Sequence, residues 1–206
     1  MDNKAYLDTI AVKGKDSSRP SLPILSPTII KLVAVGVVAI IAMIVVAMLL
    51  NNSNKSLTVS YEKIYATYTQ LAAPTSPITQ YQPKLKSSTI RAATTQLQTS
   101  INNTNVQLKN VIGQVGVDPA AISEEATTAV TTDITTLSIE FESGYYAGTL
   151  DYSYATAVYA QISKMIAVQT EARQQTENAA FAAVLDTSLS DLKTIQEQFK
   201  NFIDAA

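Results

Sequence analysis

The chain of 206 residues contains neither cysteine nor histidine. Without cysteine there can be no disulfide, no thiol nucleophile, no thiolate metal site and no lipid attached through an N-terminal cysteine. Without histidine the chain lacks the commonest general base and metal ligand, and with it the Glu-x-x-His pairs that di-iron helical bundles require. We therefore expect no metal ion and no other cofactor.

Other signatures of catalysis are missing as well. No phosphate loop of the Gly-x-x-x-x-Gly-Lys kind occurs in the sequence. Glu140 and Glu142 are two residues apart, so on a helix they point to different faces and do not share a site. No spacing singles out a Ser or Thr nucleophile with a Lys or carboxylate base. The formal net charge of −2 argues against nucleic acid as a partner. The sequence thus predicts a protein that is not an enzyme and does not bind nucleic acid.

One long apolar run is present, from Leu32 to Leu50. Its nineteen residues, at about 1.5 Å each, reach about 28 Å as a helix, close to the thickness of the hydrocarbon core of a bilayer. Only a helix satisfies all backbone groups of a single crossing segment. We predict a transmembrane helix over residues 28–50, with the lipid bilayer as a partner. The run passes into Asn51 without a small-x-small cleavage site, which favours an uncleaved signal anchor.

Basic residues near the run indicate its orientation, because Lys and Arg are enriched on the cytoplasmic side. Four lie on the N-terminal side and two on the C-terminal side: Lys13, Lys15, Arg19 and Lys31 against Lys55 and Lys63. This predicts a single-pass protein of the plasma (cytoplasmic) membrane with its N-terminus inside. Residues 1–27, rich in proline and serine, are expected to form a disordered cytoplasmic tail too short for an output domain. A bundle on the cytoplasmic side is the alternative.

After the apolar run the spacing of apolar residues is helical throughout. Leu57, Tyr61, Ile64, Tyr68 and Leu71 form a heptad seam typical of a coiled coil. The later helices are expected over about 84–114, from Asp118-Pro119 onward, over 150–184 and over 189–202, with a loop between Pro74 and Pro83 and a turn at Asp186–Ser188. The polar stretch 169–178 leaves a break there open. We predict an all-α, antiparallel helical bundle of five segments, formed by residues 51–206 as one extracytoplasmic domain.

The expected core stripes follow from the same spacing, and three threonine pairs are interpreted as the polar face of the third helix. The stripes are Ile90, Leu97, Ile101, Leu108, Ile112 and Val115; then Ile122, Ala126, Val130, Ile134, Leu137, Phe141 and Tyr145; then Leu150, Tyr154, Val158, Ile162, Met165, Val168 and Ala172; then Leu189, Leu192, Ile195, Phe199 and Phe202. The threonine pairs are Thr127-Thr128, Thr131-Thr132 and Thr135-Thr136.

Alternate turns of an antiparallel bundle lie at the same end, so the Pro74–Pro83 loop and the turn near Gly144–Asp151 should meet away from the membrane. Tyrosines beside cations suit sugar faces, peptide side chains or anionic polymers. The candidate partner-binding residues at this distal end are Tyr81, Lys84, Lys86, Arg91, Tyr145, Tyr146 and Tyr152, with Tyr154 as a further candidate. The alternative is that Tyr145 and Tyr154 complete the core and that Lys84 and Lys86 are ordinary solvated charges.

The function expected from these features is that of a membrane-anchored, non-catalytic surface or envelope protein whose bundle binds a protein or glycan partner. A small-ligand sensor that signals through a separate cytoplasmic protein is one alternative, and a structural spacer or assembly subunit is another. Charge is segregated along the chain, with +5 over residues 51–115 and −9 over residues 116–206. This pattern suits either complementary packing within the bundle or homo-oligomerisation through opposite faces.

Overall fold

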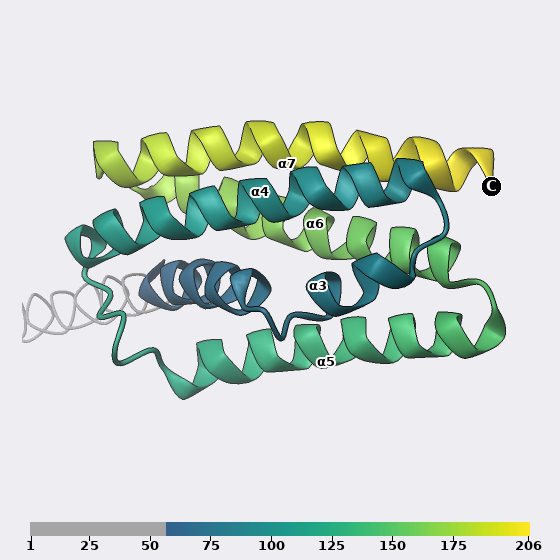
Figure 1. The fold of residues 1–206 in the computed structure, drawn as a ribbon. Helices are drawn as coiled ribbons and strands as arrows, with labels where there is room; N and C mark the ends of the chain where they lie inside the picture. Colours follow the sequence, from purple (N-terminus) through teal and green to yellow (C-terminus); the bar gives the residue numbers. More distant parts are fainter. Residues whose placement is uncertain (1–56) are drawn as a thin grey trace, which may run out of the picture. The chain divides into compact units, whose positions relative to one another are not determined.

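The computed structural model describes residues 57–206, and every regular element in that range is a helix. A first helix covers residues 57–72 and is called the 57–72 helix below. It is followed by α3 (Pro77–Tyr81), η2 (Gln82–Lys84), α4 (Ser88–Val111), η3 (Ile112–Val115), α5 (Glu124–Ala147), α6 (Leu150–Gln175) and α7 (Ala179–Ala205). Figure 1 shows the long helices packed along a common direction. The predicted all-α class and bundle packing are confirmed for this part of the chain.

The predicted tail (1–27), the predicted membrane helix (28–50) and the residues up to 56 lie outside the described range. Among residues 57–206, no helix combines the length and the apolar character that a bilayer crossing requires. The membrane helix at 28–50 therefore stays a prediction from the sequence.

The 57–72 helix carries much of the core. Its predicted seam is confirmed, since Tyr61, Ile64, Tyr68 and Leu71 are buried. The ring of Tyr61 meets that of Phe181 on α7 edge to face, with centroids 4.8 Å apart. The hydroxyl of Tyr68 hydrogen-bonds Ser188 on α7 and accepts a hydrogen bond of 3.0 Å from Nε2 of Gln169 on α6. The 57–72 helix is thus held from several sides by the others.

The proline-rich segment is more ordered than the sequence predicted. We expected a loop from Pro74 to Pro83, but α3 and η2 form within it. Pro77 lies in the first turn of α3, where a missing backbone N–H costs nothing because that group has no partner inside the helix. Ile78 on α3 and Leu85 directly after η2 are buried in the core. This segment therefore contributes to the core and is not only a connecting loop.

Helix α4 is shorter than the predicted 84–114. It begins after Ser87, whose hydroxyl accepts a hydrogen bond of 3.4 Å from the backbone N–H of Ile90. At the other end the chain tightens into η3 and stops at Gly116, which has a φ of 79°. Glycine adopts this left-handed conformation without the steric cost that other residues meet. The predicted core stripe is confirmed in Ile90, Leu97, Ile101, Leu108 and Ile112.

The start of α5 corrects a prediction. Asp118-Pro119 was expected to begin the helix, but α5 begins at Glu124 with Ser123 as its N-cap. The carboxylate of Asp118 instead accepts a hydrogen bond of 2.9 Å from the N–H of Ala120, which closes a local turn. Ser123 bonds Ala126 within α5, and its hydroxyl also bonds the carboxylate of Glu62 on the 57–72 helix. A tertiary partner thus selects one of two plausible caps.

The boundary between α6 and α7 is a second correction. We preferred a turn at Asp186–Ser188, but the chain turns at residues 176–178, within the polar stretch where a break had been left open. Asn178 caps α7, since its Oδ1 accepts a hydrogen bond of 2.9 Å from the N–H of Phe181. Asp186 lies within α7 and pairs with Arg173 of α6 at 2.7 Å. Ser188 is fully buried, where it bonds Tyr68.

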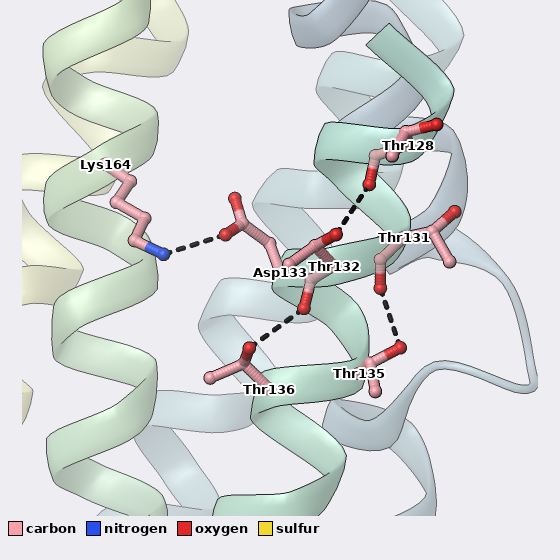
Figure 2. Close-up of polar contacts among 7 residues, drawn as sticks. All are labelled: Thr128, Thr131, Thr132, Asp133, Thr135, Thr136 and Lys164. Atoms are coloured by element: carbon pink, nitrogen blue, oxygen red, sulfur yellow. Dashed lines mark hydrogen bonds and ion pairs between the residues drawn. The ribbon is translucent and has the colours of Figure 1, made fainter. Parts of the chain in front are cut away.

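The threonine pairs lie on the exposed face of α5, as predicted. Figure 2 shows the hydroxyls of Thr132, Thr135 and Thr136 directed back along the helix, where each donates to the carbonyl of the residue four positions earlier at 2.8–2.9 Å. In the same view Lys164 of α6 reaches across to Asp133 at 2.8 Å. The threonine pairs of α5 therefore satisfy their hydroxyls within the helix, while Asp133 is ion-paired at the seam with α6.

Candidate functional site

The two loops expected at the distal end do meet there. The carboxylate of Asp151, in the first turn of α6, accepts hydrogen bonds from the backbone N–H of Lys86 at 2.9 Å and of Ser87 at 2.8 Å. These two residues lead into α4, so one side chain fixes the turn between α5 and α6 against the loop before α4. We call this end of the bundle the distal tip. Glu62 and Ser123 bond each other at the opposite end, close to where the 57–72 helix begins.

Lys84 lies at the centre of the aromatic residues of the distal tip. Its Nζ atom is 4.1 Å from the centroid of the Tyr81 ring and 5.1 Å from that of the Tyr145 ring. Both distances fall within the range of a cation–π interaction, which is worth about 0.5–1 kcal/mol at an exposed site. Two tyrosines 64 positions apart in the sequence, Tyr81 and Tyr145, therefore both contact one ammonium group.

The outer tyrosines offer a large contact area to the solvent. Tyr146 is 79 % exposed, Tyr145 is 51 % exposed and Tyr152 is 49 % exposed. The rings of Tyr145 and Tyr146 are arranged edge to face, with centroids 5.7 Å apart and planes at 71°. The prediction placed Tyr145 on both the core stripe and the tip; the structure places it at the tip, because its side chain is half exposed and lies beside Tyr146 and Lys84.

Four of the predicted residues line one shallow hollow of about 320 Å³: Lys84, Lys86, Tyr145 and Tyr152. Five further residues line the same hollow and were not among the predicted site residues: Gly148, Thr149, Leu150, Asp151 and Phe202. Phe202 comes from the last turns of α7, and the antiparallel order of the helices was the signal that could have placed it there. Nothing in the sequence marked Asp151 as the acceptor for two backbone groups 64 and 65 positions away.

Two other candidates are placed differently. Nη1 of Arg91 lies 3.5 Å from the carbonyl oxygen of Leu85, to which it donates, and Arg91 does not line the hollow. Tyr154 is fully buried, its ring stacks on that of Phe141 at 4.4 Å, and its hydroxyl donates to the carbonyl of Ile78 at 3.4 Å. Tyr154 is therefore a core residue, which corrects its place among the tip candidates.

The phenol of Tyr81 stays protonated at neutral pH. Partial desolvation raises its pKa above the ordinary value of 10.0, and the carboxylate of Glu142 raises it further. Tyr81 can therefore donate a hydrogen bond to a partner, while Lys84 and Lys86 offer positive charge and Asp151 is engaged by the backbone. The distal tip combines aromatic faces, hydroxyl groups and cations within one surface.

Among residues 57–206, no group of three or more Asp and Glu side chains is arranged to hold a metal ion. The fold and the tip together define a helical bundle with an aromatic and cationic end surface. Comparison with protein-family models, with curated proteins and with solved structures finds no match to this chain.

Proposed function

We propose that the protein is a membrane-anchored, non-catalytic surface or envelope protein whose distal tip binds a protein or glycan partner. The observation that carries this proposal is the Lys84 ammonium group between the rings of Tyr81 and Tyr145, beside the exposed ring of Tyr146. Rigid tyrosine rings give contact area at a small cost in side-chain entropy, and their hydroxyls add hydrogen bonds. Such surfaces suit sugar faces and peptide side chains.

The proposed membrane arrangement supports this use of the distal tip. The membrane helix predicted over 28–50 precedes the 57–72 helix in the chain. That helix begins near the Glu62–Ser123 end, and the distal tip lies at the other end of the bundle. With the N-terminus inside the cell, as the basic residues favour, the bundle and its distal tip would lie outside the cell, where external partners can reach them.

Removing two tip side chains should weaken binding without unfolding the bundle. We expect Lys84→Ala combined with Tyr146→Ala to lower the affinity for the partner at least tenfold, because interface tyrosines and cations each commonly contribute about 1 kcal/mol or more. The measurement is binding of the purified full-length chain to an array of defined glycans and, in parallel, to envelope proteins isolated by cross-linking at the tip. Both exposed side chains can be removed with little loss of packing.

A matched control is available on α4. Val106 is 60 % exposed and Lys109 is also exposed, so Val106→Ala with Lys109→Ala removes one apolar and one cationic side chain outside the tip. The control should bind like the wild-type chain. Full binding by the tip variant, or an equal loss in the control, would contradict the assignment of the tip.

A further inference from the structure

The cations of the distal tip have no carboxylate as an ion-pair partner. Four ion pairs form within residues 57–206, and neither Lys84 nor Lys86 takes part in any of them. Both lysines line the shallow hollow of about 320 Å³ at the tip. The rings of Tyr81 and Tyr145 attract the charge of Lys84 but do not neutralise it. The hollow therefore presents two positive charges to a ligand.

Two carboxylates lie near these cations, but neither forms an ion pair with them. One oxygen of Asp151 accepts a hydrogen bond from the N–H of Lys86 and the other accepts one from the N–H of Ser87. Both oxygens of this carboxylate are thus bonded to the backbone, which offsets its negative charge. Desolvation and the nearby carboxylate of Glu142 raise the pKa of the Tyr81 phenol, but Glu142 does not line the hollow. The hollow is therefore better suited to an anion than to a cation.

The uncharged part of the hollow suits a sugar ring. Tyr145 and Tyr152 line it and are about half exposed, so the C–H face of a sugar can lie against their rings. Their hydroxyls and that of Thr149 both donate and accept hydrogen bonds, as sugar hydroxyls do. The volume of the hollow is at the lower end of the range of about 300–1,000 Å³ for ligand pockets. It therefore suits one sugar unit of a longer chain.

A protein partner fits this hollow less well. Protein interfaces are anchored by side chains that become fully desolvated in a pocket. The hollow of the tip is open, and only Leu150 and Phe202 among its lining residues have large apolar side chains without a polar group. Among residues 57–206 there is also no strand to whose edge a peptide could add. These observations favour a glycan over a peptide.

We propose that the distal tip binds an acidic glycan. One sugar ring lies in the hollow against Tyr145 and Tyr152. The acidic group of that sugar, a carboxylate or a sulfate, lies beside Lys84 and Lys86. This inference rests on the function proposed for the tip and narrows its partner to a glycan with negatively charged sugars.

The test compares trigalacturonic acid with its trimethyl ester, two trisaccharides that differ in charge but share the same sugar rings. Isothermal titration calorimetry measures their binding to the full-length chain in lipid nanodiscs. We expect the acid to bind at least about fivefold more tightly at low salt, because two exposed ion pairs together contribute a factor of this size. Added salt should reduce this preference, because ions screen exposed charges. A sulfated galactan oligosaccharide, which has no carboxylate, shows whether sulfate can replace the carboxylate.

Three variants separate the contribution of charge from that of the sugar ring. Lys84→Gln with Lys86→Gln should abolish the preference for the acid and leave the affinity for the ester nearly unchanged. Lys109→Gln with Lys193→Gln removes the same charge from exposed positions outside the hollow and should keep the preference. Tyr152→Ala should weaken the binding of the acid and of the ester alike, because it removes a ring on which both sugars lie.

The outcomes distinguish this inference from the function proposed for the tip. Equal affinity of the wild-type chain for the acid and the ester would overturn the inference and leave a glycan site without preference for charge. Failure of both trisaccharides to bind would also overturn it, and binding of hexaglutamate in that case would identify an acidic peptide as the partner. The proposed function itself fails only if the tip variant and its α4 control bind the partner equally.

Discussion

Tyr68→Ala is expected to lower the free energy of unfolding by about 3–5 kcal/mol, as for other large aromatic side chains removed from a core. Tyr68 is among the largest fully buried side chains of the described range. Its loss opens a cavity between the 57–72 helix, α6 and α7, and leaves Ser188 and Gln169 without the hydroxyl that they bond. Urea unfolding of the full-length chain, followed by far-ultraviolet circular dichroism, measures the change.

Tyr68→Phe separates the effect of the cavity from the effect of the lost hydrogen bonds. It keeps the ring and removes only the hydroxyl, so we expect a loss of about 1–3 kcal/mol. Gln70→Ala on the exposed side of the same helix is the control and should change stability by less than about 0.5 kcal/mol. If Tyr68→Ala and Gln70→Ala were equally stable, the packing of the 57–72 helix against α6 and α7 would be wrong.

The same burial gives a pH dependence as a second readout. Burial raises the pKa of Tyr68 from 10.0 to about 12, although hydrogen bonds from Ser188 and Gln169 oppose the shift. Because the folded state favours the protonated phenol, its contribution is fully present below pH 10 and is lost as the pH rises towards 12. The difference of about two pH units corresponds to roughly 2–3 kcal/mol. Between pH 10 and pH 12 the free energy of unfolding of Tyr68→Phe should therefore fall less than that of the wild-type chain.

Gly144→Ala is expected to lower the free energy of unfolding by about 1–3 kcal/mol, the usual range for overpacking. Gly144 is buried in the last turn of α5, against the start of α6. A Cβ atom there would lie 2.5 Å from Cβ of Ser153 and 3.3 Å from Cα of Leu150. Cβ of Ser153 is bonded directly to the backbone and cannot rotate away from this contact, so α5 and α6 must move apart.

Gly113→Ala provides the matched control, because a Cβ atom at Gly113 meets nothing within 4 Å and this glycine has no positive φ. It should be neutral or stabilising by up to about 1 kcal/mol. Thermal unfolding of both variants compares them directly. Since Tyr145 and Tyr146 follow Gly144, its variant should also weaken binding at the distal tip. Equal stability of the two variants would contradict the close approach of α5 and α6.

The apolar spacing predicted which helix faces are buried, because a buried face requires apolar residues every three to four positions and this period can be read from the sequence. The stripes through Tyr68, Leu97 and Val158 are buried as expected. The helix ends were harder to predict. Asp118 and Ser123 are both acceptable caps on local grounds, and the choice between them follows from Glu62 on another helix.

The same holds for the distal tip. The distal tip could be predicted because antiparallel order brings alternate turns together, and Asp151 confirms that these two meet. Two residues of the tip could not be predicted. Phe202 lies there because of where α7 ends, and Asp151 is held there by backbone N–H groups that no local sequence pattern reveals. The burial of Gln169 against Tyr68 was not predicted, since a polar residue on a polar stretch gives no sign that it is buried.

We propose that the bundle, with its binding tip, stands outside the cell on a single membrane helix. Because the chain has no cysteine, Ser17→Cys in the predicted tail and Ser190→Cys on the exposed side of α7 would each carry the only thiol. A membrane-impermeant thiol reagent applied to intact cells should label Ser190→Cys and spare Ser17→Cys until the cells are permeabilised. Labelling of Ser17→Cys alone on intact cells would place the bundle in the cytoplasm and contradict the account.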